Sequence, residues 1–177
     1  MNKLIILSDL WGIQKSKWSD FYLKAFEHHF EVQFYDVCQL GEIDISNYTQ
    51  DNLHQQFLSF GIDKAVHNLF KKEIEAVYIL GISIGGVIGW KAIQKGLNAK
   101  YIYGISATRL RYETESIPCP CKLLYGALDE YKPDNQWFNG KNIPFEILPS
   151  YSHDLYDNPL IAEKVAKEII QFSSLSK

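Results

Sequence analysis

The sequence predicts an α/β fold, a three-layer sandwich in which helices cover both faces of a mostly parallel, six-stranded sheet. Three observations support this prediction. Short runs of strand length alternate with amphipathic runs of helix length along the chain. The short runs are apolar at nearly every position, which is typical of strands buried on both faces. The 177 residues are 46% hydrophobic and 22% charged, an ordinary globular balance.

Each strand is predicted from one apolar run, and each helix from apolar residues that recur at helical spacing. The six predicted strands span residues 3–8, 31–37, 75–83, 99–106, 121–127 and 143–149. The predicted helices span 16–30, 53–69 (one helix, or two broken at Gly61), 84–95 (ended by Gly96) and about 159–172. The segment 107–120 is expected to be a loop, and no composition shift marks a domain boundary. We therefore expect a single domain over residues 1–177, with strand order 2-1-3-4-5-6.

Charge and hydropathy exclude several classes of function. The net charge is −3 and is spread without long runs, so neither a nucleic-acid surface nor a polybasic membrane patch is expected. No run approaches the roughly 18 apolar residues of a membrane span. The apolar run 4–7 is too short for a signal peptide, and Asp9 follows it at once. We expect a soluble, cytoplasmic protein.

The three cysteines do not suggest a disulfide framework or a metal site. Their number is odd, and Cys119 and Cys121 form a C-x-C pair with no further cysteine or histidine close by in sequence. A reduced pair at the start of a strand is the simplest interpretation. A cysteine nucleophile is the alternative, although no surrounding motif would activate the thiol. No metal or organic cofactor is expected.

The segment "YILGISIGGVIGW" places a serine between a buried strand and an apolar helix. Gly81, Ser83 and Gly85 form the pattern G-x-S-x-G, in which a sharp turn exposes a nucleophilic serine. Glycines are needed there because side chains two residues away would clash with the turn. A tight structural turn is the alternative. The pattern is neither a G-x-G-x-x-G loop nor a P-loop.

A serine hydroxyl needs a base, and this motif requires an acid and then a histidine after later strands. Asp129 follows the fifth predicted strand, and His153 follows the sixth. His153 is the only histidine after Ser83, so it is the only candidate base. Glu130 and Asp154 are neighbours of the preferred residues, and Glu130 remains the alternative acid. The other four histidines are expected on helices or at helix ends, with surface roles: His28, His29, His54 and His67.

An oxyanion hole would take one backbone amide from Ile84, the residue after the serine. The second amide is expected from the loop "SDLWG" after the first strand, which the predicted strand order places beside the serine. Leu10 or Trp11 would donate it, and their side chains would line an apolar substrate pocket. Plain core packing is the alternative role for these two side chains.

The chain resembles the α/β-hydrolase superfamily in "GISIGG", "GALDEYKP", "SYSHDLYDNP" and "LSDLWG", which together span nearly its whole length. "GALDEYKP" is similar to the superfamily's G-x-x-D-x-x-x-P loop, which implies that Asp129 is the acid. Two features depart from the pattern. Ser8-Asp9 replaces the common His-Gly before the oxyanion residue, and "SYSH" replaces G-x-G-H. The first two strands and the cap domain of the superfamily are expected to be absent, which would leave an open site.

The resemblance implies a serine hydrolase that cleaves a carboxylic ester or thioester through an acyl-serine, with Ser83, Asp129 and His153 as the catalytic residues. An open site would accept a small substrate or an acyl group attached to a larger carrier. An amidase, peptidase or acyltransferase would use the same three residues. A catalytically silent protein of this fold, which binds a ligand or partner, is the alternative from a different class.

Overall fold

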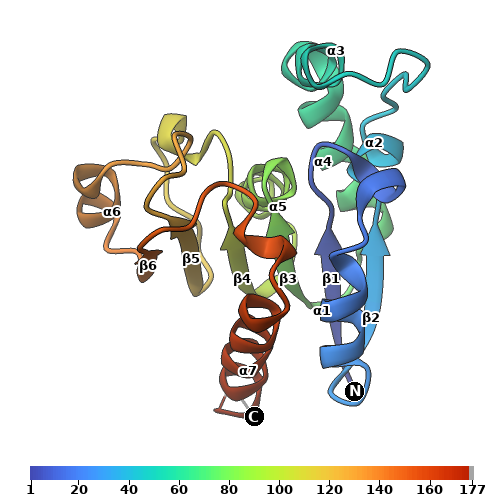
Figure 1. Cartoon of the computed structure of the whole chain (residues 1–177). Helices are drawn as coiled ribbons and strands as arrows, with labels where there is room; N and C mark the ends of the chain where they lie inside the picture. Colours follow the sequence, from blue (N-terminus) through green and yellow to red (C-terminus); the bar gives the residue numbers. More distant parts are fainter. Residues whose placement is uncertain (176–177) are drawn as a thin grey trace.

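The computed structural model describes residues 1–175, which form one six-stranded sheet flanked by helices (Figure 1). The sheet order is β2-β1-β3-β4-β5-β6, and all neighbouring strands are parallel. The predicted fold class and strand order are confirmed. The strands are β1 (Asn2–Leu7), β2 (Phe30–Tyr35), β3 (Val77–Ile82), β4 (Ala99–Ile105), β5 (Cys121–Gly126) and β6 (Phe145–Leu148).

The apolar run of the first strand fills both faces of the sheet. Leu4 and Ile6 belong to one buried cluster, whereas Ile5 and Leu7 belong to the other, because successive side chains of a strand point to opposite faces. β3 is buried at every position. This two-sided burial explains why the central strands read as continuous apolar runs.

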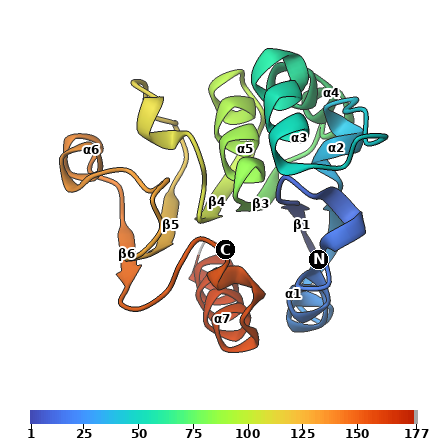
Figure 2. The same cartoon turned by 45° about the horizontal axis from the view of Figure 1, so that its top comes forward.

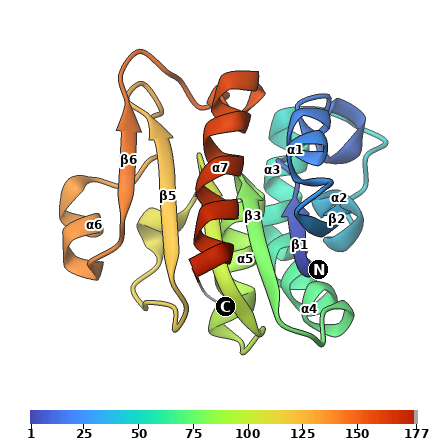
Figure 3. The same cartoon turned by 90° about the horizontal axis from the view of Figure 1, so that it is seen from below.

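Two helices cover one face of the sheet and the other helices lie mainly on the opposite side (Figure 2). α1 and α7 pack on the first face, with α7 running along the strands in front of the sheet centre (Figure 3). α4 and α5 pack on the opposite face. The helices are α1 (Ser19–Phe26), α2 (Val37–Leu40), α3 (Gln50–Gln56), α4 (Ile62–Lys72), α5 (Ile84–Gln94), α6 (Asn135–Lys141) and α7 (Pro159–Leu175).

The structure decides between the two alternatives for residues 53–69 and adds two short helices, α2 and α6, that were not predicted. α3 and α4 are joined by a π-helical turn, Phe57–Gly61, so Gly61 does not break the helix. Instead, a Cβ atom on Gly61 would lie 2.5 Å from Ile43 Cδ1, so glycine permits close packing there. α6 begins where the Asp134 carboxylate accepts a hydrogen bond from the Trp137 N–H at 2.8 Å.

The parallel strands bring the predicted site residues to one end of the sheet. Ser83, Asp129 and His153 lie in the segments that follow the carboxyl ends of β3, β5 and β6. α3 rises above this end in Figure 1. The segment from β4 to β5, residues 106–120, contains one short 3-10 turn, Leu110–Tyr112, and forms no cap domain.

Candidate active site

Ser83 occupies a strained backbone conformation between β3 and α5. Its φ and ψ angles are 53° and −117°, a region that a non-glycine residue rarely adopts. Three backbone hydrogen bonds maintain this turn. The Ser83 N–H donates to the Ile105 carbonyl at 2.9 Å, and the Ser83 carbonyl accepts from Gly86 N–H at 3.0 Å and Thr108 N–H at 3.1 Å. The turn is therefore anchored to the end of β4.

Two glycines allow this turn to pack against its surroundings. A Cβ atom on Gly81 would lie 2.6 Å from Gly86 Cα, and one on Gly85 would lie 2.5 Å from the carbonyl oxygens of Leu7 and Ser8. Both distances are shorter than real Cβ contacts. The glycines are thus a steric requirement, and Gly85 brings the turn into contact with the loop that follows β1.

The three predicted catalytic side chains form a continuous hydrogen-bonded chain. Ser83 Oγ lies 2.9 Å from His153 Nε2, and His153 Nδ1 lies 2.9 Å from Asp129 Oδ2. Asp129 is 1% exposed, and its Oδ1 accepts a hydrogen bond from the Tyr131 N–H at 2.9 Å. The rings of Tyr131 and Tyr156 lie edge-on to the imidazole, with centroids at 5.3 and 6.2 Å. The imidazole is therefore held at both nitrogens and flanked by two rings.

The alternative acids lie outside this chain of hydrogen bonds. Glu130 is exposed, and Asp154 accepts a hydrogen bond from Ser152 Oγ at 2.6 Å. Among residues 1–175, Asp129 is the carboxylate within hydrogen-bonding distance of the His153 imidazole, with Oδ2 2.9 Å from Nδ1. The structure thus places Asp129, the acid that the sequence favoured, next to the His153 imidazole.

In the loop after β1, one of the two amides predicted for the oxyanion hole already donates a hydrogen bond within the loop. The Trp11 N–H donates to Asp9 Oδ1 at 3.0 Å, a bond in which an Asx side chain caps its own turn. Of the two alternatives predicted for the oxyanion hole, Leu10 or Trp11, the Trp11 amide is thus engaged by a side chain within the loop. The Leu10 N–H and the Ile84 N–H have no hydrogen-bond partner within the described chain. Both amides therefore remain candidates for the predicted oxyanion hole.

Asp9 is buried below this loop and is held by donors from three segments. Besides the Trp11 amide, its Oδ2 accepts from Trp18 Nε1 at 3.2 Å and from the Tyr156 hydroxyl at 3.1 Å. Burial raises the pKa of Asp9 to about 6, although these hydrogen bonds act in the opposite direction. The carboxylate that replaces the common glycine is thus a structural centre of the loop.

Asp9 gives the fold a specific pH dependence. Its pKa rises from 3.8 to about 6 on folding, so the folded state takes up this proton as the pH falls through 6. We therefore expect the free energy of unfolding of the wild type to increase relative to Asp9→Asn by up to roughly 3 kcal/mol between about pH 7.5 and pH 4. Urea titrations of both proteins at several pH values measure this difference. A difference that stays constant with pH would contradict the assignment.

A hollow of about 470 Å³ opens beside Ser83 and His153. Leu10 and Trp11, which were predicted to line a substrate pocket, line this hollow together with Ile84. The Lys15 ammonium lies over the Trp11 ring, 3.8 Å from the ring centroid. The Trp11 backbone carbonyl accepts a hydrogen bond from the Tyr48 hydroxyl.

Sequence reasoning missed several residues of this hollow. His54 is exposed, as predicted, but it also lines the hollow from α3. Thr108, Arg109 and Arg111 line it from the segment after β4. The signal that could have revealed the arginines is their position directly after a strand whose carboxyl end meets the Ser83 turn.

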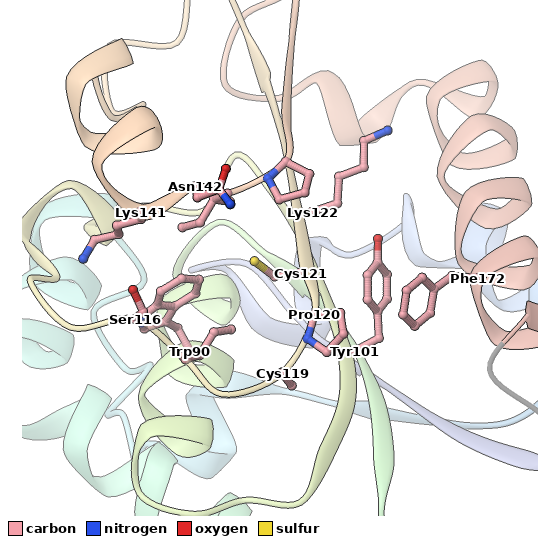
Figure 4. Close-up of a pocket in the computed structure, with 13 residues that line it drawn as sticks. Trp90, Tyr101, Ser116, Cys119, Pro120, Cys121, Lys122, Lys141, Asn142 and Phe172 are labelled. Atoms are coloured by element: carbon pink, nitrogen blue, oxygen red, sulfur yellow. The ribbon is translucent and has the colours of Figure 1, made fainter.

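The cysteine pair lies at the opposite end of the sheet, around a second hollow of about 340 Å³ (Figure 4). Cys119 and Cys121 are free thiols. Burial raises the pKa of Cys119 to about 11 and of Cys121 to about 12, so both are protonated near neutral pH. Trp90 also lines this hollow, and its buried indole N–H has no hydrogen-bond partner among residues 1–175.

Comparisons with solved structures identify the fold. A protein from Xanthomonas campestris pv. campestris, provisionally described as a hydrolase of the alpha/beta superfamily, matches with a TM-score of 0.72 at 12% identity, over 97% of this chain and 99% of its own. A serine hydrolase without a lid from Xanthomonas campestris matches at 0.61 and 14%, over 96% and 80%. A serine hydrolase homologue from Coxiella burnetii matches at 0.66 and 16%, over 93% and 83%. This chain has the α/β-hydrolase fold. No protein-family model and no curated protein matches the sequence.

Within the α/β-hydrolase fold, this chain has six strands and only the short segment 106–120 where a cap domain usually inserts. One neighbour is itself described as lacking a lid. Among residues 1–175, no helix combines the length and apolar character needed to cross a membrane, and no group of three or more metal-ligating side chains occurs.

Proposed function

We propose that this protein is a serine hydrolase that cleaves a carboxylic ester or thioester through an acyl-serine intermediate. The observation that carries this proposal is the hydrogen-bonded chain Ser83–His153–Asp129, with both distances at 2.9 Å, beside a hollow large enough for a small substrate. Solved structures of the same fold that are described as hydrolases support the broader assignment.

In this mechanism His153 Nε2 removes the proton from Ser83 Oγ as the hydroxyl attacks the substrate carbonyl. Asp129 holds the Nδ1–H tautomer and stabilises the imidazolium that forms. The Ile84 and Leu10 amides stabilise the oxyanion, helped by the amino end of α5. The protonated His153 then gives its proton to the leaving group, and water activated by the same imidazole releases the acyl group.

The exposure of the site supports a substrate that extends beyond the hollow. The segment 106–120 supplies one wall but no roof, so the leaving group could project from the protein or be attached to a larger carrier. Acyl transfer to an acceptor other than water is less favoured, because an open site does not exclude water.

Labelling with a fluorophosphonate probe tests the proposal directly. We expect a single adduct by intact mass, mapped to the peptide that contains Ser83, with unchanged labelling in the exposed-serine control Ser59→Ala. Nitrophenyl esters and acyl-thioesters of graded chain length then define the acyl preference. Absence of a Ser83 adduct in folded wild-type protein would contradict the proposal and favour a silent binding protein, the alternative supported by the Asp9 carboxylate beside the proposed oxyanion hole.

A further inference from the structure

The chain places both of its arginines in the hollow beside Ser83. Of its 18 basic Lys and Arg residues, only Arg109 and Arg111 are arginine. Both line this hollow, whereas no lysine among residues 1–175 does. Arginine differs from lysine in presenting a planar fork of N–H donors that matches a carboxylate. The distribution therefore points to recognition of a specific group and not to a general surface charge.

Arg109 is held close to the nucleophile by the backbone. The preceding residue, Thr108, donates its N–H to the Ser83 carbonyl at 3.1 Å. Arg109 itself has a left-handed φ of 66°, which is uncommon for a residue with a long side chain. Backbone strain of this kind persists only where the surrounding structure maintains it. The position of Arg109 on the wall of the hollow is thus tied to the Ser83 turn.

The two guanidinium groups flank one aromatic ring without an acidic partner. Arg109 Cζ lies 5.0 Å and Arg111 Cζ 4.7 Å from the centroid of the Tyr112 ring. Among residues 1–175, neither arginine forms an ion pair. Arg111 donates one hydrogen bond, to the Tyr131 carbonyl at 2.7 Å, whereas the Arg109 guanidinium donates none within the same residues. The two guanidinium charges lie close together without an acidic partner, so an anion bound between them would be stabilised by both.

His54 is a third basic side chain of this hollow. It lines the hollow from α3, and its pKa is lowered by burial and by the positive charge of Arg109, while Asp51 opposes that shift. The other carboxylates of the hollow are already engaged: Asp9 accepts three hydrogen bonds and Asp154 accepts one from Ser152. Asp51 is the acid that partly offsets the positive charge in this hollow.

We propose that Arg109, supported by Arg111, binds a carboxylate carried by the substrate, so that the preferred esters are monoanions such as half-esters of dicarboxylic acids. This inference rests on the proposed function and assigns its substrate class. The ester carbonyl would lie at Ser83 and the carboxylate at the wall formed by residues 108–112.

Matched ester pairs test this inference. The probes are 4-nitrophenyl half-esters of adipic acid and longer diacids, each compared with its ω-methyl ester, which has the same chain but no charge. We expect Arg109→Gln to lower kcat/KM for the charged esters by about 10- to 100-fold and to leave the neutral esters within about twofold. Arg109→Lys should recover only part of the loss, and the surface variant Lys71→Gln should lose nothing.

A binding measurement separates this inference from the proposed function. In NMR titrations of Ser83→Ala, adipate should raise the pKa of His54 by neutralising the charge on Arg109, and the effect should vanish when Arg109→Gln is added. Equal losses for charged and neutral esters, or no effect of adipate on His54, would overturn the carboxylate site while leaving the hydrolase intact. A wild type that turns over no ester but binds adipate would overturn the proposed function alone.

Discussion

Ser83→Ala should abolish ester hydrolysis, with kcat falling on the order of 10⁴-fold or more. Without Oγ, no acyl-serine can form, and the His153 imidazole has lost the hydroxyl that lies 2.9 Å from its Nε2. Initial rates with a nitrophenyl ester at saturating substrate concentration, divided by enzyme concentration, give this loss. The free energy of unfolding should change by about 1 kcal/mol or less, since one partly buried hydrogen bond is removed.

Ser106 provides a matched control for this substitution. It follows β4 as Ser83 follows β3, it is fully buried, and it also has a positive φ, of 48°. Its hydroxyl has no hydrogen-bond partner in residues 1–175. Ser106→Ala should therefore keep the activity within a few-fold of wild type. Substantial turnover by Ser83→Ala, or equal losses in the two variants, would show that Ser83 is not the nucleophile.

Gly85→Ala should strongly damage the Ser83 turn. The new Cβ would lie 2.5 Å from the carbonyl oxygens of Leu7 and Ser8, which are backbone atoms of β1 and its loop and have no rotamer that relieves the clash. We expect a loss of about 3 kcal/mol in the free energy of unfolding, together with loss of activity. Urea unfolding and ester turnover measure the two effects.

Gly140→Ala is the control for that experiment. Gly140 lies in α6, and a Cβ there would meet no atom within 4 Å. Alanine is favoured over glycine in a helix, so this variant should be as stable as the wild type or more stable by about 0.5–1 kcal/mol. If Gly85→Ala unfolds at the same urea concentration as Gly140→Ala, the proposed close packing of the turn on β1 is wrong.

The fold was predictable because its strands carry the signal at nearly every residue. β3 is buried throughout, and its apolar run is therefore unbroken. Segments that depend on a single local interaction were harder. α6 begins at one Asp134 side-chain hydrogen bond, and its only fully buried side chain is Phe138, so its apolar pattern is short. A break at Gly61 stayed an open alternative because composition does not reveal that Ile43 packs against this glycine.

The site was predictable where chain order and strand ends determine it. Ser83, Asp129 and His153 come together because parallel strands end at one edge of the sheet. The missed features depend on contacts between loops. The Trp11 amide is engaged because the Asp9 side chain turns back to it, and His54 lines the hollow from α3, which stands above this end of the sheet. Neither relation has a periodic signature in the sequence. The catalytic roles of these residues remain predictions for the experiments above.

The segment 106–120 has a consequence for how proteins of this architecture can diverge. Both of its ends are anchored in the sheet, since Ser106 N–H donates to the Leu124 carbonyl at 2.9 Å and Ile102 N–H donates to the Pro120 carbonyl at 3.2 Å. The entropy of closing a loop grows only with the logarithm of its length, so doubling such a segment costs about 0.6 kcal/mol. A roof over the site could therefore be gained or lost by insertion at one place while the sheet stays unchanged. The openness of this protein would then be a property of one connection and not of its architecture.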